Sequence, residues 1–233
     1  MRRSTFVLPM VFLLVPVAAA AQHRIGGGLE ISSPRGEFDA NTDTGFGFGL
    51  RYRYGFGPGG LVSVGANGSF QNYGSARRRA PLSTTIPEIE VEISTTNNIF
   101  YLEGALELAA SAGRLQPYAV ATYGAGFFYT TSSLKDPLTN ETVLTDTNQS
   151  DWTWVWSAGG GLRILLREMP RLEGGEPGRL FLDLGASRMA GGDVEYLREG
   201  TLVTDEGEFD IDERLARSEI ELILYRIGVT YQF

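Results

Sequence analysis

Apolar and polar residues alternate along most of this chain with a period of two, the spacing that places side chains on opposite faces of a strand. The stretch 218–233 shows the pattern most clearly. Its apolar row consists of Ile223, Tyr225, Ile227, Val229, Tyr231 and Phe233. The opposite row is small or polar and has Arg226 in its middle. About ten alternating residues match the length of one tilted membrane-spanning strand.

Eight segments carry this two-faced pattern, and the connections between them alternate in length. The segments are Arg24–Ser33, Thr44–Gly55, Leu61–Tyr73, Asn98–Ala110, Pro117–Thr130, Trp152–Arg167, Arg179–Ser187 and Ser218–Phe233. Short turns are expected at 55–60, 111–116 and 168–178, and long polar loops at about 74–97, 132–151 and 189–217. An even strand number with short turns on one side is typical of transmembrane barrels. We therefore predict an all-β, antiparallel, up-and-down transmembrane β-barrel of eight strands. Ten strands would require a further spanning hairpin in the long loops, which lack a clean apolar row.

The first residues have the features of a secretory signal peptide. Arg2 and Arg3 precede an apolar stretch, and Ala19–Ala21 offer small residues before a cleavage site. We expect a signal peptide at 1–21 and a barrel domain at 22–233. The alternative, a membrane-anchoring helix, is disfavoured because Pro9 and Pro16 interrupt a short apolar run.

Charge and glycine placement favour a membrane barrel over a soluble one. Without the leader the chain has 18 basic and 28 acidic residues, a net charge of −10, which argues against a nucleic-acid partner. The polar rows contain glycines at 45, 47, 49, 124, 126, 159 and 161, whereas the apolar rows carry aromatic residues near their ends. Small residues inside a narrow barrel leave room for large charged ones, and aromatic ends are typical of interfacial girdles.

The polar rows also contain charges of both signs, which predicts an ion-pair network in the lumen. Its members are Glu30, Arg51, Arg53, Glu103, Glu107, Arg163, Asp183 and Arg226. We expect Arg163 to lie beside Asp183, and Glu30 beside Arg226, because a lone buried charge is costly. Two interpretations remain open: a structural plug, or a gated narrow pore whose pairs exchange partners.

From Arg24 to Phe233 the chain resembles the small eight-stranded outer-membrane barrels of the OmpA-, OmpX- and OmpW-like kind. The resemblance rests on strand pattern, loop alternation and the terminal aromatic residue. It implies a monomer in the outer membrane of a Gram-negative-type envelope, in contact with outer-membrane lipid and lipopolysaccharide. It also implies that Tyr225, Ile227, Val229, Tyr231 and Phe233 form the signal that the barrel assembly machinery reads. The expected role is structural or surface-interacting. The alternative is a narrow channel or transporter for ions or small amphipathic molecules.

Catalysis is not expected. Hydrolase-like chemistry needs a histidine base, and the single histidine, His23, lies beside the predicted mature N-terminus. The chain has no cysteine and no Gly-x-Ser-x-Gly motif. We expect no enzyme activity, no cofactor and no metal.

The long loops offer candidate contacts of two kinds. Arg77, Arg78, Arg79 and Arg188 are candidates for lipopolysaccharide phosphates, because arginine binds phosphate through two parallel hydrogen bonds. A solvated loop is the alternative. The acidic stretch 205–213 does not have EF-hand spacing, and a solvated hairpin is favoured over weak Ca²⁺ binding.

Overall fold

A computed structural model of the protein describes residues 22–40, 42–83, 86–110, 113–135, 142–171, 177–197 and 215–233. Its strands are β1 (Gln22–Pro34), β2 (Gly45–Phe56), β3 (Val62–Ser83), β4 (Ile86–Ala109), β5 (Leu115–Lys135), β6 (Thr142–Arg171), β7 (Pro177–Leu197) and β8 (Leu215–Gln232). Two short helices, α1 (Gly36–Asp39) and η1 (Pro58–Gly60), flank β2. Neither of these described helices is long and apolar enough to cross a membrane.

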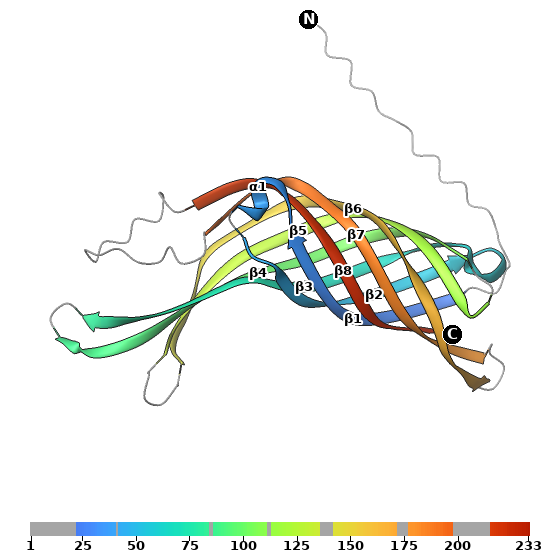
Figure 1. Ribbon diagram of the computed structural model, residues 1–233, viewed down its shortest axis with the longest axis horizontal. Coiled ribbons are helices and arrows are strands. Elements are labelled where there is room, and N and C mark those ends of the chain that lie inside the picture. Colours follow the sequence, from blue (N-terminus) through green and yellow to red (C-terminus); the bar gives the residue numbers. More distant parts are fainter. Residues whose placement is uncertain are drawn as a thin grey trace, which may run out of the picture.

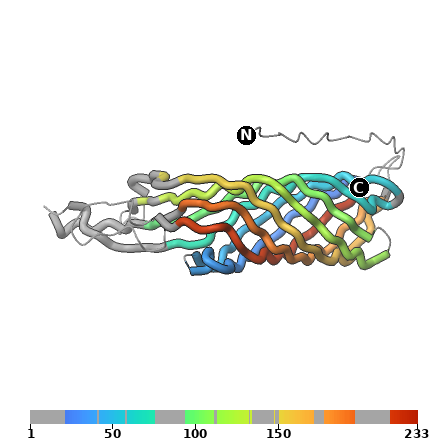
Figure 2. Tube along the Cα trace, turned by 90° about the horizontal axis from the view of Figure 1, so that it is seen from above, coloured from blue at the N-terminus to red at the C-terminus, as the bar shows by residue number. Residues whose placement is uncertain are grey.

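The eight strands form one closed barrel in chain order (Figures 1 and 2). Every neighbouring pair is antiparallel, and β8 closes the ring by pairing with β1 from Arg24–Gln232 to Pro34–Leu222. The prediction of an eight-stranded up-and-down barrel is therefore confirmed. We call the end where β1 starts and β8 finishes the turn end, and the opposite end the loop end.

The first turn-end connection explains why its sequence is rich in glycine. Gly57, Gly59 and Gly60 have φ angles of +74°, +67° and +68°, a region that side-chain-bearing residues rarely adopt. These angles let the chain reverse between β2 and β3 within a single turn of η1.

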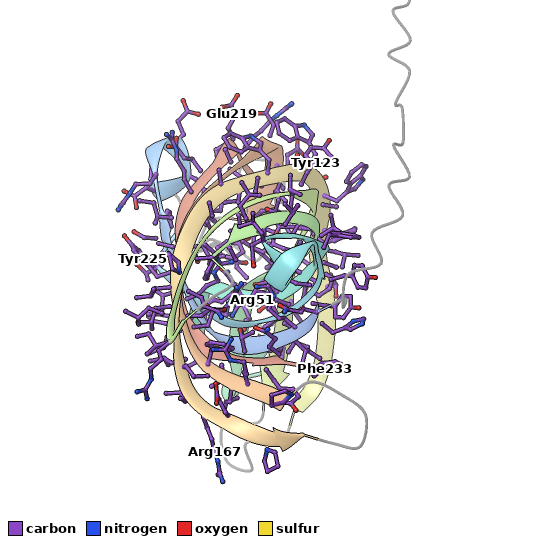
Figure 3. All side chains as sticks on the ribbon, turned by 90° about the vertical axis from the view of Figure 1, so that its right-hand side faces the viewer. Arg51, Tyr123, Arg167, Glu219, Tyr225 and Phe233 are labelled. Atoms are coloured by element: carbon purple, nitrogen blue, oxygen red, sulfur yellow. The ribbon has the colours of Figure 1, made fainter. Side chains whose placement is uncertain are left out.

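The apolar rows face outward, as expected for a barrel in lipid. Leu29, Leu50 and Trp152 are 65%, 62% and 64% exposed, whereas the charged residues of the opposite rows are buried. Figure 3 shows Arg51 within the ring and Tyr225 and Phe233 outside it. A water-soluble barrel would bury its apolar row. The reversed arrangement requires an apolar surrounding.

Glycines on the inner face provide space for the large side chains of other strands. A Cβ atom at Gly49 would lie 2.7 Å from the Glu30 carboxyl carbon. One at Gly185 would lie 2.7 Å from the Tyr118 hydroxyl and 3.2 Å from Arg226 Nη2. A larger residue at either position would displace these side chains from the lumen.

Each of the three predicted long loops begins and ends in strand within the described residues. The β3–β4 ladder continues to Ser83–Ile86, the β5–β6 ladder to Lys135–Thr142 and the β7–β8 ladder to Leu197–Leu215. Strand therefore replaces most of the loops expected at 74–97 and 132–151, and both ends of the one expected at 189–217, in the part of the chain that the structure describes. The reason is physical: strands beyond the membrane have water on their outer faces, so they lose the apolar row on which the prediction relied.

The loop end carries helix α1, an element that the sequence did not predict. Helix α1 inserts Phe38, 1% exposed, against Tyr73 and Phe128, with ring centroids 6.2 and 6.3 Å away. Thr42 Oγ1 donates to the Phe38 carbonyl at 2.6 Å, and the Arg35 amide donates to the Glu221 carbonyl at 2.8 Å. Inward residues of four strands complete the apolar cluster that contains Phe38: Ile99, Tyr101, Val155, Met189, Val194, Ile220, Leu222 and Leu224.

The outward orientation predicts that the cost of a charge depends on depth. Leu102 and Leu108 lie on the same face of β4 and are 55% and 54% exposed, but Leu108 is close to the turn end. Leu102→Arg should lower the free energy of unfolding by about 2–4 kcal/mol and Leu108→Arg by about 0–1 kcal/mol. Urea unfolding in phospholipid vesicles measures both, and equal costs would contradict the assignment of the lipid-facing surface.

Candidate functional site

Nine charged side chains from six strands meet in the middle of the lumen. Inward alternation from each strand brings them there. They are Arg24 and Glu30 from β1, Arg51 and Arg53 from β2, Glu103 and Glu107 from β4, Arg163 from β6, Asp183 from β7 and Arg226 from β8. Their side chains are almost completely buried.

Glu107 is the centre of this network because three arginines converge on it. Arg163 Nη2 lies 2.6 Å from Glu107 Oε1, Arg24 Nη2 lies 3.3 Å from the same atom, and Arg53 Nε lies 3.4 Å from Oε2. The Glu107 side chain is 2% exposed. One carboxylate thus ties β1, β2, β4 and β6 together across the lumen.

Asp183 forms a second centre with both neutral and charged partners. The Tyr118 hydroxyl donates to Oδ1 at 2.7 Å and Thr230 Oγ1 donates to Oδ2 at 2.9 Å. Arg163 Nε and Arg51 Nη2 lie 3.7 and 3.9 Å from Oδ2. The Arg163 guanidinium also covers the Tyr118 ring at 4.3 Å, which fixes its plane.

Glu30 depends mainly on neutral donors. It accepts a hydrogen bond from Ser69 and one from Gln71 Nε2 at 3.4 Å, and Arg51 Nη1 lies 3.7 Å away.

Glu103 is held in the same way. It accepts a hydrogen bond from Thr122 and one from Asn67 Nδ2 at 3.4 Å. Asn67 Oδ1 in turn accepts from Arg53 Nη2 at 2.7 Å, so an amide connects this carboxylate to the arginines.

The structure places all eight residues of the predicted ion-pair network in the lumen and joins six of them in ion pairs. Arg163 and Asp183 are directly opposite each other in the ladder. Glu30 and Arg226 are also opposite each other, yet Glu30 takes Arg51 as its ionic partner. Among the described residues Arg226 has no carboxylate within 4.0 Å.

Sequence reasoning missed Arg24 and the neutral residues that satisfy the carboxylates. Arg24 lies six residues before Glu30, so the same alternation that placed Glu30 inside could have found it. The sequence does not single out Tyr118 and Asn67 in the same way. An inward polar residue can simply occupy space in the lumen without a hydrogen bond to a carboxylate.

The cavity that remains among these side chains is about 10 Å³ in volume, close to the space of one water molecule. Within the described residues no group of three His, Asp or Glu could hold a metal ion.

The other candidate residues lie away from this network. Tyr225, Ile227 and Val229 on the outer face of β8, and Phe233 just after its last residue, are between 45% and 52% exposed. Tyr231 lies on the same face of β8 and is half-buried. The proposed role of these five residues as an assembly signal stays a prediction. Arg188 is outward, with its side chain 67% exposed, and its Nη2 lies 2.6 Å from Glu221 Oε1.

Two further regions contain residues that were predicted to make contacts. Arg77, Arg78 and Arg79 belong to the extension of β3, in register with Ser94, Ile93 and Glu92, and their side chains lie outside the description. The acidic stretch 205–213 lies outside the described residues.

His23 belongs to the outer surface of the turn end. Its Nδ1 is 2.9 Å from the Tyr52 hydroxyl, and its ring stacks on Phe233 with centroids 5.5 Å apart.

Residues 5–168 match the family model of the outer membrane protein beta-barrel domain. Because this match spans more than half of the chain, the protein belongs to that family and is a β-barrel of the outer membrane. In barrels of this class short turns face the periplasm, so the turn end is periplasmic and the loop end faces outward.

Similar solved structures are also small outer-membrane proteins. Neisserial surface protein A matches with 9% identity over 92% of this chain and 96% of its own, at a TM-score of 0.41. The attachment invasion locus protein Ail of Yersinia pestis, in complex with the heparin analogue sucrose octasulfate, matches with 16% identity over 91% and 97%, at 0.35. A major outer membrane protein of Thermus thermophilus matches with 14% identity over 92% and 100%, at 0.41. A search of curated protein sequences finds no significant match.

The convergence of three arginines on Glu107 predicts a large cost for neutralising it. Glu107→Gln keeps the shape but leaves three buried cations without their shared carboxylate, so the free energy of unfolding should fall by about 3–5 kcal/mol. Glu168→Gln is the matched control. It breaks the pair with Arg179, in which Glu168 is 64% exposed, and should cost about 0–1 kcal/mol.

Urea unfolding of the two variants in the same vesicles gives the comparison. Similar losses for both would show that Glu107 does not organise the lumen.

Proposed function

We propose that this outer-membrane barrel does not conduct and serves as an anchor that holds extended hairpins at the cell surface. The observation that carries the proposal is the occupied lumen, in which the cavity between the charged side chains has a volume of about 10 Å³. A hydrated ion needs a continuous water path, and one water-sized cavity does not provide it.

The apolar cluster at the loop end supports the same conclusion independently. Phe38 lies across this end and is 1% exposed, above the buried Tyr101, Phe128 and Leu222. A narrow passage lined by apolar side chains opposes the entry of water and ions. The lumen is thus filled by two groups of side chains: the ion-pair network, and the apolar cluster around Phe38 at the loop end, which we call the apolar cap.

The strands beyond the barrel body support a surface role. The β3–β4 ladder reaches Ser83–Ile86, whereas β2 accompanies β3 only to Phe46–Asn72 (Figure 1). In the described part of the chain, residues 74–83 of β3 therefore have no strand partner on the β2 side. An open edge can accept a strand from another protein.

Single-channel recording tests the proposal. Refolded residues 22–233 should give baseline current in planar bilayers, and so should Arg226→Ala, because Arg226 takes part in none of the Glu107 ion pairs. Heat-modifiable gel mobility verifies folding, and an open porin in the same bilayers verifies the recording.

Steady discrete openings of the wild-type protein would support the channel alternative and contradict the proposal that the barrel does not conduct. Openings confined to Arg226→Ala would show that the apolar cap does not close the lumen.

We also propose that the loop end contacts lipopolysaccharide through Arg188. This residue follows the apolar row of β7 where the row leaves the membrane, and its side chain is 67% exposed. Glu221 engages Nη2, which leaves other guanidinium donors for a phosphate. Arg217 is a suitable comparison, because it is 65% exposed, is paired with Asp193 at 3.0 Å and lies further from the membrane.

Arg188→Gln should weaken lipopolysaccharide binding by roughly tenfold, the loss of about 1.5 kcal/mol expected for a hydrogen bond to a charged group. Arg217→Gln should leave it unchanged. Binding of the refolded proteins to lipopolysaccharide-containing vesicles measures the difference, and equal affinities for the two variants would remove Arg188 from the contact.

A further inference from the structure

A β-bulge near the turn end of β6 changes the face to which one charged residue belongs. In the β6–β7 ladder, two steps along β6 from Leu165 to Arg167 correspond to a single step along β7, which ends at Leu180. Leu166 is therefore an extra residue, and a bulge of this kind redirects the side chains beside it. Without the extra residue, Arg167 would continue the inward row of Arg163 and Leu165. With it, Arg167 shares the outer face of Leu180.

The outer face at this position is the lipid-facing surface of the barrel. Leu180 is opposite Tyr231, an outward residue of β8, and both are half-buried. Leu166 is 54% exposed, and Leu115 at the start of β5 is 56% exposed. Arg167 is itself exposed, and its side chain points away from the ring (Figure 3). A guanidinium group is therefore held beside exposed apolar side chains at the periplasmic boundary of the membrane.

The Arg167 guanidinium has no carboxylate within 4.0 Å in the part of the chain that the structure describes. The next residue, Glu168, is opposite Arg179 in the ladder, and its Oε1 lies 3.7 Å from Arg179 Nε. Arg179 Nη2 also donates to the Gly113 carbonyl at 3.0 Å, beside the exposed Arg114. Three arginines and one glutamate thus lie at this corner of the turn end, although the whole chain has a net charge of −8.

We propose that Arg167 binds the headgroup phosphate of an anionic phospholipid of the phosphatidylglycerol class in the periplasmic leaflet. Arginine holds phosphate through two parallel charge-assisted hydrogen bonds. Its methylene groups lie along apolar surface while the guanidinium reaches the headgroups, and the acyl chains of the same lipid contact Leu166 and Leu115. The surplus of positive charge at this corner favours a headgroup with a net negative charge over a zwitterionic one. This inference is independent of conduction and of the contact proposed for Arg188.

Unfolding in two kinds of vesicle tests the proposal on the mature protein. One kind consists of phosphatidylcholine and the other of phosphatidylglycerol with the same acyl chains, and urea is the denaturant. The quantity compared is the ratio of the unfolding equilibrium constants in the two lipids, because a lipid that binds only the folded state lowers this constant. A basic residue beside anionic lipid contributes about 1 kcal/mol, so Arg167→Gln should reduce the preference for phosphatidylglycerol about fivefold. An unchanged ratio would overturn the proposal.

Arg114→Gln is the matched control, because Arg114 is exposed at the same end but precedes the first residue of β5. It feels the charge of the lipid surface only at a distance, and salt at about 1 M screens such attraction beyond about 3 Å. In this salt Arg114→Gln should have the wild-type ratio, whereas the effect of Arg167→Gln should persist. Equal effects of the two substitutions in high salt would refute a direct contact at Arg167.

Solid-state NMR detects the contact in the wild-type protein. Dipolar coupling between isotope-labelled arginine Cζ and lipid phosphorus in phosphatidylglycerol vesicles should include a signal that Arg167→Gln lacks and Arg114→Gln retains. The same signal should be weaker in phosphatidylcholine, and equal strength in both lipids would contradict the preference for an anionic headgroup. The absence of any such coupling in the wild-type protein would refute the site even if Arg167→Gln fails to fold.

Discussion

The structure depends on one constraint: an eight-stranded barrel is too narrow to hold bulk water, so its inward polar groups must satisfy one another. Backbone groups of the wall are paired within the ladders, which leaves the side chains. Glu107 meets this demand with three arginines, and Asp183 meets it with a tyrosine, a threonine and two arginines. Because each centre draws partners from several strands, the polar interior also joins opposite walls of the barrel. The network therefore acts as the core that a soluble protein would build from apolar residues.

Such a core needs space as well as partners, and the inner glycines supply it. Long side chains reach the axis only where the facing positions are small. The missing side chain at Gly49 leaves space for Glu30, and the one at Gly185 leaves space for Tyr118 and Arg226. The same residues that weaken a strand through lost side-chain packing are thus required here, because the volume they leave is filled by charged groups from neighbouring strands. Glycine and arginine on the inner face are two parts of one packing solution.

The sequence predicted the barrel, its strand number and its inward charges, because a two-residue period and an apolar outer row are direct consequences of spanning lipid. Strand length was underestimated for β3 to β8, since the apolar row ends where the membrane ends while the hydrogen-bonded ladder continues. Pairing within the lumen was predicted only in part. The register brought Arg163 to Asp183, but Glu30 took Arg51 rather than Arg226. The register of the strands sets how deep each residue lies in the barrel. It does not set the partner of an arginine, because the long arginine side chain reaches carboxylates on strands across the lumen. Helix α1 and its Phe38 had no periodic signal, because a four-residue helix spans about one turn.

All five cations of the lumen are arginine, and this choice has a physical reason. A buried lysine can lose its proton and so relieve an excess of charge, whereas arginine remains charged and offers five donors in a fixed plane. A lumen built on lysine could therefore change its charge with pH. This one cannot do so through its cations, so its five positive charges persist, and protonation acts only on its four carboxylates.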